Sequence, residues 1–417
     1  MALKPGYKQT EVGAIPEEWG VVQLVDLKPF ITSGSRGWAS FYSESGSLFV
    51  RITNLSRESI YLDFDDSKFV RLPPETSEGV RTQLKEHDVL ISITADIGMI
   101  GYVDEHVPMP AYINQHIALV RFDSSKTCGK FVSYFLASER PQKLFRASTD
   151  TGAKAGMSLG TVQKILTAHP PLPEQYAIAT ALSDVDALLG ALERLIVKKR
   201  DLKQAAMQQL LTGQTRLPGF HGEWEVVSMR GVLTQSATYG IVTAGVFVQN
   251  GVKMLRGGDI VDGRVNTDLP MVSRDKAVEY VRTVLEQDDV VIALVGYPGA
   301  SAKIPEELVG ANISRAVGLL RLNSKVVPDF VVCFLNSPEG RRMVLAPSAG
   351  SAQQVVNLAA LNKLQFTIPP LPEQTAIASV LTDMDAELEA LQQRLAKTRA
   401  LKQGMMQELL TGRTRLL

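Results

Sequence analysis

One stretch of about 48 residues occurs twice in this chain of 417 residues, and it restricts the possible folds more than any other feature. The first copy covers residues 170–217 and the second covers residues 369–416. Both copies open with Pro-Pro-Leu-Pro-Glu-Gln and end with Leu-Leu-Thr-Gly-x-Thr-Arg-Leu, and about 30 of the aligned positions are identical. Such internal similarity predicts a chain built from two tandem halves.

Each copy predicts one long helix. Its apolar residues recur by alternating steps of four and three, the heptad pattern of a helix packed lengthwise against a partner. These positions are Ile178, Leu182, Val185, Leu189, Leu192 and Ile196 in the first copy, and Ile377, Leu381, Met384, Leu388, Leu391 and Leu395 in the second. A single heptad helix is most often a packing or dimerisation element. Two matched helices in one chain can pair with each other, so we expect an intramolecular antiparallel pair.

The composition indicates a soluble protein of two to four domains. Lysine plus arginine and aspartate plus glutamate number 44 each, and mean hydropathy is near zero. No apolar run approaches the roughly 18 residues of a membrane span, and the first residues lack an apolar signal core, so we expect a cytoplasmic protein without membrane contact. Cys128 and Cys333 lie far apart and outside any CxxC pair, which argues against a disulfide framework or a zinc site.

The two segments outside the repeats share an order of predicted elements. Strands are predicted at 47–53, 88–94 and 117–121 and a helix at 130–137, and these recur as strands at 252–256, 289–294 and 317–321 and a helix at 330–335. We therefore predict an α+β fold. Two mixed domains, 1–168 and 218–368, are joined by two long antiparallel coiled-coil helices within 169–217 and 369–417, as an internal pseudo-two-fold repeat.

The connecting segments differ most between the two domains, and loops on a shared scaffold are where recognition residues commonly lie. They are rich in side chains that read base edges and bind phosphates, although any solvated loop contains the same residue types. The candidates for base contact are Arg36, Thr94, Asp96, Asn114, Gln115 and Lys154 in the first domain, and Tyr239, Tyr297, Ser301, Lys303, Arg315 and Gln353 in the second.

No catalytic motif stands out from the background. The chain has no GxxxxGK[ST] loop, no GxGxxG after a strand, no HExxH, and no Asn-Pro-Pro-Tyr or Asp-Pro-Pro-Tyr tetrapeptide. Asp184 and Asp186, repeated as Asp383 and Asp385, are two residues apart and so point to different faces of a helix, unlike a carboxylate pair that shares a proton. We predict a chain without catalytic or metal-binding residues and without a cofactor of its own.

The doubled Pro-Pro-Leu-Pro-Glu-Gln helix, the Leu-Leu-Thr-Gly ends and the two divergent domains together resemble the specificity (S) subunit of type I restriction-modification systems. The resemblance covers the whole chain. It implies two target-recognition domains that each read half of a split double-stranded DNA sequence, with helices that space them and dock two modification (M) subunits. The M subunits would bind S-adenosylmethionine and methylate adenine, and restriction (R) subunits, if present, would use ATP and Mg²⁺. Asn114-Gln115 matches the family's Asn-Gln, whereas Asn312 is followed by Ile313.

Charge alone does not mark these domains as DNA-binding. Residues 20–169 contain about 16 basic and 16 acidic side chains, and residues 225–368 about 14 and 13, without the excess expected of an independent DNA binder. We therefore expect the M subunits to neutralise much of the phosphate charge. A different reading is a coiled-coil scaffold that tethers two protein-binding or carbohydrate-binding domains without touching DNA. A fused enzyme would need methyltransferase motifs that the sequence lacks.

Overall fold

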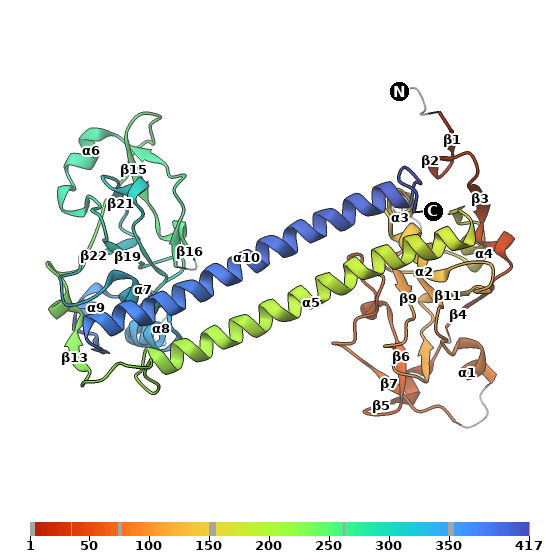
Figure 1. The fold of residues 1–417 in the computed structure, drawn as a ribbon, viewed down its shortest axis with the longest axis horizontal. Coiled ribbons are helices and arrows are strands. Elements are labelled where there is room, and N and C mark those ends of the chain that lie inside the picture. The colour runs from red at the N-terminus through yellow and green to blue at the C-terminus, as the bar shows by residue number, and fades with distance from the viewer. Residues whose placement is uncertain are drawn as a thin grey trace. The chain divides into compact units, whose positions relative to one another are not determined.

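The computed structural model describes residues 5–34, 36–73, 77–149, 156–261, 263–348 and 354–416. The chain divides into two compact units (Figure 1). Unit 1 contains Met1–Leu192 and Arg394–Leu417, and unit 2 contains Glu193–Gln393. Each unit therefore combines one of the two mixed domains with parts of both long helices.

Unit 1 is built on two four-stranded sheets. The first has the order β4 (Phe30–Ser33), β11 (Ile117–Arg121), β8 (Val89–Ser92), β9 (Ile100–Tyr102), and the second β10 (Ala111–Ile113), β6 (Ser47–Val50), β7 (Phe69–Val70), β5 (Tyr42–Ser43). Two antiparallel pairs, β1 (Tyr7–Thr10) with β2 (Gly13–Pro16) and β3 (Gly20–Gln23) with β12 (Leu166–His169), complete the strands. The short helices are α1 (Ser77–Thr82), α2 (Gly129–Ala137), α3 (Glu139–Thr149) and α4 (Leu159–Gln163).

Unit 2 repeats this plan with shorter strands. Its sheets are β14 (Thr238–Tyr239), β22 (Val317–Leu320), β19 (Val290–Ala293), β20 (Ser301–Lys303), and β18 (Met271–Val272), β15 (Val252–Leu255), β21 (Asn312–Ile313). The pairs are β13 (Glu225–Ser228) with β23 (Gln365–Ile368) and β16 (Ile260–Val261) with β17 (Arg264–Val265), and the helices are α6 (Arg274–Val278), α7 (Pro328–Asn336), α8 (Pro338–Leu345) and α9 (Leu358–Lys363). The α+β fold and the predicted order of strands and helices are confirmed.

The two repeats form α5 (Leu172–Leu210) and α10 (Leu371–Leu409), each a helix of 39 residues. Their antiparallel pairing is visible within each unit. In unit 1 the Lys402 ammonium lies 2.6 Å from the Asp186 carboxylate. In unit 2 Lys203 pairs with Asp385 in the same way, so one contact occurs twice with the roles of the two helices exchanged. The predicted antiparallel pair is confirmed.

The heptad positions are not used uniformly. Ile178 and Leu182 lie in the hydrophobic core of unit 1, and Ile377 and Leu381 lie in that of unit 2. Farther along the helices, Leu189, Leu192 and Ile196 are buried, whereas Val185, Met384, Leu388, Leu391 and Leu395 are half-buried. The start of each helix therefore packs into a domain core, and its burial stabilises that domain as well as the helix pair.

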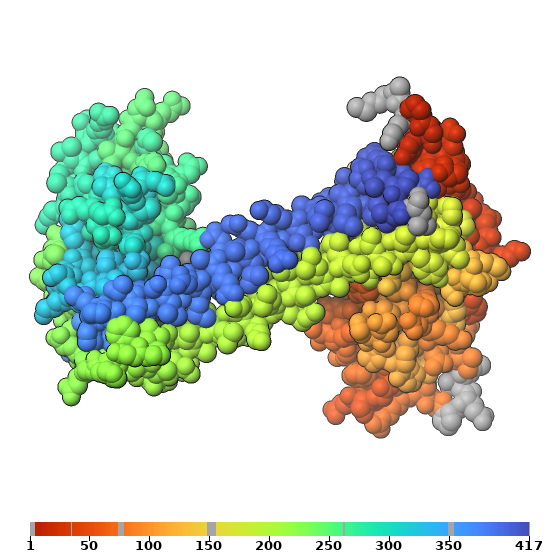
Figure 2. Space-filling model, viewed as in Figure 1, coloured from red at the N-terminus to blue at the C-terminus, as the bar shows by residue number. Residues whose placement is uncertain are grey.

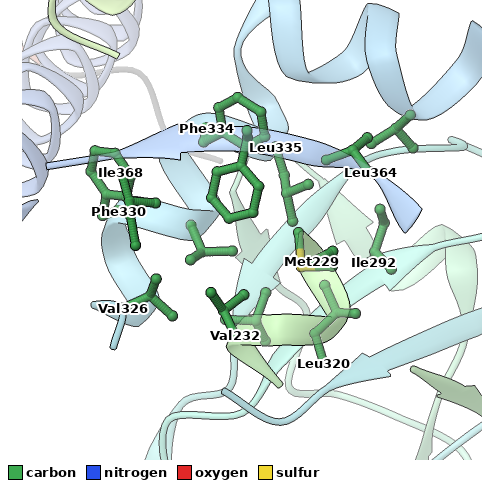
Figure 3. Close-up of a cluster of buried hydrophobic side chains, with 14 of the residues drawn as sticks. Met229, Val232, Ile292, Leu320, Val326, Phe330, Phe334, Leu335, Leu364 and Ile368 are labelled. Atoms are coloured by element: carbon green, nitrogen blue, oxygen red, sulfur yellow. The ribbon is translucent and has the colours of Figure 1, made fainter. Parts of the chain in front are cut away.

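Aromatic and aliphatic side chains from the sheets and from α7 fill the core of unit 2 (Figure 3). In this view Phe330 lies beside Ile368, and Phe334 lies near Leu335. Phe334 also stacks on Phe366 of β23, with 4.7 Å between the ring centroids. These contacts attach α7 to the strand that leads directly into α10.

A buried ion pair fixes the corresponding strands in each unit. The Arg121 guanidinium on β11 donates two hydrogen bonds of 2.7 Å to Asp88, and Arg321, directly after β22, donates two of 2.9 Å to Asp289. Burial raises the pKa of Asp88 above its usual value, opposed by the hydrogen bonds from Arg121. The two domains, whose loop sequences differ, therefore share the same buried Arg–Asp ion pair.

A second shared contact joins the end of each repeat to the start of the other, and we call it the helix clamp. In unit 1 the Arg415 guanidinium donates a 2.8 Å hydrogen bond to Glu174 and lies 5.7 Å from the Trp19 ring centroid. In unit 2 Arg216 donates two bonds of 2.5 Å to Glu373 and lies 5.7 Å from the Trp224 ring. Figure 2 shows the C-terminal residues of unit 1 (blue) against its N-terminal strands (red), where the Tyr7 hydroxyl donates to the Gly412 carbonyl.

Within the described residues, no helix is long and apolar enough to cross a membrane. Over the same part of the chain, no cluster of three or more His, Cys, Asp or Glu side chains could hold a metal ion. Asp184 and Asp383 are exposed, whereas Asp186 accepts a 2.7 Å hydrogen bond from the Tyr134 hydroxyl besides its contact with Lys402. Asp186 and Asp385 therefore contact lysines of the opposite helix rather than pairing with the nearby aspartates.

Candidate functional site

Three segments of unit 1 meet where β8 ends and β11 begins. The backbone N–H of Ile93, just after β8, donates to the carbonyl of His116 in the β10–β11 turn, at 2.9 Å. Met157, which follows α3, donates in turn to the carbonyl of Ile93 at 2.7 Å. Asn114 donates to the carbonyl of Val50 at the end of β6, which ties the turn to the second sheet. This edge gathers most of the first domain's candidate residues, and we call it the recognition edge.

Side-chain hydrogen bonds fix the recognition edge of unit 1. The Thr94 hydroxyl and His116 Nδ1 lie 2.5 Å apart, and Gln115 Nε2 lies 3.2 Å from His116 Nε2. Both ring nitrogens of His116 therefore have a side-chain partner. The Asn114 side chain also accepts from the backbone N–H of His116 at 3.1 Å. His116 therefore orients Gln115.

Asp96 belongs to the same edge but has a different contact. Its exposed carboxylate pairs with Arg57, whose guanidinium also donates to the Ile97 carbonyl at 2.9 Å and to Gln142 of α3. Arg57 therefore holds the 94–98 loop against α3. In this geometry Asp96 positions a loop through Arg57, and its charge is compensated within the domain.

Unit 2 has the same backbone arrangement with different side chains. Leu294, after β19, donates to the Ala316 carbonyl at 2.8 Å, and Val356 donates to the Leu294 carbonyl at 3.0 Å. The N–H of Ser314 donates to the Leu255 carbonyl, as that of Asn114 does to Val50. Ser314 and Arg315 thus take the places of Asn114 and Gln115.

This correspondence corrects the comparison of Asn114 with Asn312. Asn312 lies in β21 opposite Met254, as Tyr112 lies in β10 opposite Phe49, so Asn312 corresponds to Tyr112. Its fully buried amide accepts a 2.6 Å hydrogen bond from Thr283 and donates to the carbonyl of Tyr280. Asn312 is a structural residue of the core, and Ser314-Arg315 is the turn to compare with Asn114-Gln115.

A glycine in each unit allows another segment to cross this turn closely. A Cβ atom on Gly34, after β4, would lie 2.1 Å from the Asn114 carbonyl oxygen, and one on Gly240, after β14, would lie 1.9 Å from that of Ile313. Only a residue without a side chain fits either position. The segments that follow, with Arg36 in unit 1 and Ile241 in unit 2, are therefore carried past the recognition edge.

The remaining candidates lie in different environments. Arg36, Tyr239, Tyr297 and Arg315 are exposed, whereas Lys303 is half-buried and pairs with Asp329 of α7 at 2.7 Å. Ser301 is fully buried in β20, where its backbone N–H donates to Asn336, so its hydroxyl is not at the surface. Lys154 and Gln353 lie outside the described residues. We therefore base the candidate site on Arg36, Thr94, Asn114 and Gln115 in unit 1 and on Tyr239, Tyr297 and Arg315 in unit 2.

The sequence analysis did not single out His116, Arg57 or Ser314. His116 directly follows Asn114-Gln115, so a polar turn of three residues between two strands was the available signal. Arg57 is 39 residues from Asp96, and no local pattern joins them. Contacts between residues so far apart in the sequence can be identified only once the fold is known.

The chain is similar to known proteins over most of its length. A family model described as "Type I restriction modification DNA specificity domain" matches residues 16–199 and 222–398. The specificity subunit of the type I restriction enzyme EcoBI from Escherichia coli is 23% identical over 78% of this chain and 72% of its own length. The putative MjaX specificity subunit from Methanocaldococcus jannaschii is 24% identical over 98% of this chain and 97% of its own. A crystal structure of the S subunit of a type I restriction-modification system from M. genitalium covers 98% of each chain with a TM-score of 0.59 and 14% identity, which shows a shared fold.

Proposed function

Because the chain belongs to the type I restriction-modification DNA specificity family and carries two of its specificity domains, we propose that each unit reads one half of a bipartite, asymmetric DNA site. One observation carries the proposal. The same backbone frame presents Asn114-Gln115 in unit 1 and Ser314-Arg315 in unit 2. A fixed frame with different polar side chains is what two readers of different sequences require.

We propose that α5 and α10 set the distance between the half-sites and provide the surface on which two methylation subunits bind. S-adenosylmethionine and the transfer of a methyl group to adenine are assigned to those subunits. ATP and Mg²⁺ are assigned to restriction subunits where these are present. The chain itself then acts without catalysis and without a bound cofactor. Its balanced charge supports this division, because the partners would supply much of the phosphate neutralisation.

The side chains at the recognition edges favour particular bases. The carboxamide of Gln115 matches the N6 and N7 edge of adenine, and the guanidinium of Arg315 matches O6 and N7 of guanine. We propose that Gln115 contacts one base pair of the first half-site and that Arg315 contacts one of the second.

Alanine at either position tests this assignment. The complex of this chain with its methylation subunits is expressed, and methylated adenines are mapped in genomic DNA. Gln115→Ala should relax the base preference at one base pair of one half-site, and Arg315→Ala should relax it at one base pair of the other. Each substitution should cost about 1 to 3 kcal/mol of binding free energy. Lys363→Ala, an exposed cation at the end of α9, is the control and should leave the motif unchanged. Relaxation of both halves by one substitution, or of neither half by both, would contradict the assignment.

A further inference from the structure

An apolar surface loop in unit 2 has no role in the contacts described so far. It extends from Val242 to Val248, between β14 and β15. Val246 is 86% exposed and Phe247 is 49% exposed, and Val242 and Val248 are also exposed. Residues 241–251 contain no charged side chain. Several exposed apolar side chains on one loop form a candidate binding surface.

Both ends of this loop are fixed to structured elements. Ile241 donates to the Ile313 carbonyl at 2.8 Å and accepts from the backbone N–H of Arg315 at 2.9 Å. Val248 donates to the Met271 carbonyl at 3.0 Å, at the edge of β18. Ile241 is itself buried with Met254, Val272 and Ala277. The exposed residues between these anchors are therefore held beside the turn that carries Arg315.

The corresponding segment of unit 1 is folded inward. After Gly34 the chain buries Trp38, which stacks on Phe49 with 5.6 Å between the ring centroids and meets Tyr112 edge to face at 5.5 Å. The segment therefore completes a small core in unit 1. In unit 2 the equivalent stretch leaves its largest aromatic ring, that of Phe247, half exposed. The two domains differ here in what they offer at the recognition edge, and not only in sequence.

We propose that the Val242–Val248 loop enters the major groove of the half-site read by unit 2 and contacts the C5-methyl groups of thymine. This inference rests on the proposed function and adds an apolar component to it. The thymine methyl group is the apolar feature of the major groove, and aliphatic and phenyl side chains are its usual partners. An uncharged loop beside Arg315 suits this role, because residues 241–251 carry no carboxylate that would repel the DNA phosphates.

Deoxyuridine in place of thymine removes only that methyl group and provides the test. Each thymine of the mapped second half-site is replaced in turn, on either strand, and duplex binding by the complex with methylation subunits is measured. At one position or more, the unmodified protein should bind about fourfold more weakly, which corresponds to about 0.8 kcal/mol for one buried carbon. Deoxyuridine in place of thymine in the first half-site should have the same effect on binding whether or not this loop is altered.

Phe247→Ser supplies the matching change in the protein. It should weaken binding to the thymine duplex about tenfold and should bind thymine and deoxyuridine duplexes equally. Val309→Ser is the control, because Val309 is 47% exposed in the same domain but precedes β21, whereas the recognition turn follows it. Val309→Ser should retain both the affinity and the thymine preference of the unmodified protein.

Several results would overturn the proposal. They are a second half-site without thymine, equal binding of all thymine and deoxyuridine duplexes by the unmodified protein, or the same loss by Phe247→Ser on both kinds of duplex. Loss of the methylation subunits from the Phe247→Ser complex in gel filtration would identify the loop as a protein-binding surface instead. The proposed function is judged separately, because a motif without two halves in the unmodified complex would contradict it whatever the loop contacts.

Discussion

Four residues inserted into each long helix should widen the gap between the two halves of the methylated motif by one or two base pairs. The insertions follow Leu192 in α5 and Gln393 in α10, at the boundaries between the two units. At 1.5 Å per residue they lengthen each helix by about 6 Å, compared with about 3.4 Å per base pair. Four residues are close to one helical turn, so the apolar seam stays nearly in phase. The base sequence of both half-sites should not change, because neither recognition edge is altered.

A two-residue insertion at the same places is the control. It rotates the downstream half of each helix by roughly 200°, which turns the apolar positions away from the partner helix. This variant should lose methylation instead of acquiring a new spacing. Mapping methylated adenines distinguishes the outcomes. An unchanged spacer in the four-residue variant, or an altered base sequence in either half-site, would show that helix length does not set the spacing.

Loss of the helix clamp should destabilise one unit at a time. In Arg415→Ala the Glu174 carboxylate, whose side chain is 2% exposed, loses its charged partner but keeps the 3.1 Å hydrogen bond from Trp19 Nε1. An uncompensated buried carboxylate costs about 3 kcal/mol, which is about 10 °C in the melting temperature of a unit of this size. Circular dichroism on heating measures this loss.

The equivalent change in unit 2 should cost more. The side chain of Glu373 is 1% exposed, and Trp224 Nε1 has no hydrogen-bond partner among the residues that the structure describes. Arg216→Ala therefore removes the two guanidinium bonds without a tryptophan N–H left in compensation. Combining each substitution with glutamine at Glu174 or Glu373 removes the buried charge and should restore part of the lost stability. A double variant no more stable than its single variant would contradict this account of the clamp.

The elements of this fold were predictable from the sequence because their signals are local. Heptad spacing predicts α5 and α10, and runs such as Ile117–Arg121 predict buried strands whose bounds the structure reproduces. The duplication predicts the pairing, since two matched helices in one chain can bind each other. The partners across long separations, such as Arg415 with Glu174, have no local signal and depend on how the chain closes.

The recognition edge was only partly predictable. Asn114 and Gln115 occupy a turn between strands, as the sequence pattern indicates, but their counterpart in unit 2 is displaced from Asn312 to Ser314-Arg315. The two domains differ in strand and loop lengths, so matching residue types misaligns them where backbone hydrogen bonds do not. Ser301 shows a related limit, because a serine within a Gly- and Ala-rich stretch is compatible with either a loop or a buried strand. Whether Ser301 belongs to a loop or to a buried strand depends on how the rest of the domain packs around it, which the local sequence does not contain.

Exchanging one recognition domain tests the central claim most directly. Residues 225–368 are replaced by the matching segment of a specificity subunit whose target is known, and α5 and α10 are kept. Methylated adenines are then mapped for the original and exchanged chains in complex with the same methylation subunits. The proposed function predicts that one half of the motif changes to the donor's half while the other half and the spacer stay the same. A change in both halves, or in neither, would contradict the claim that each unit reads its half independently.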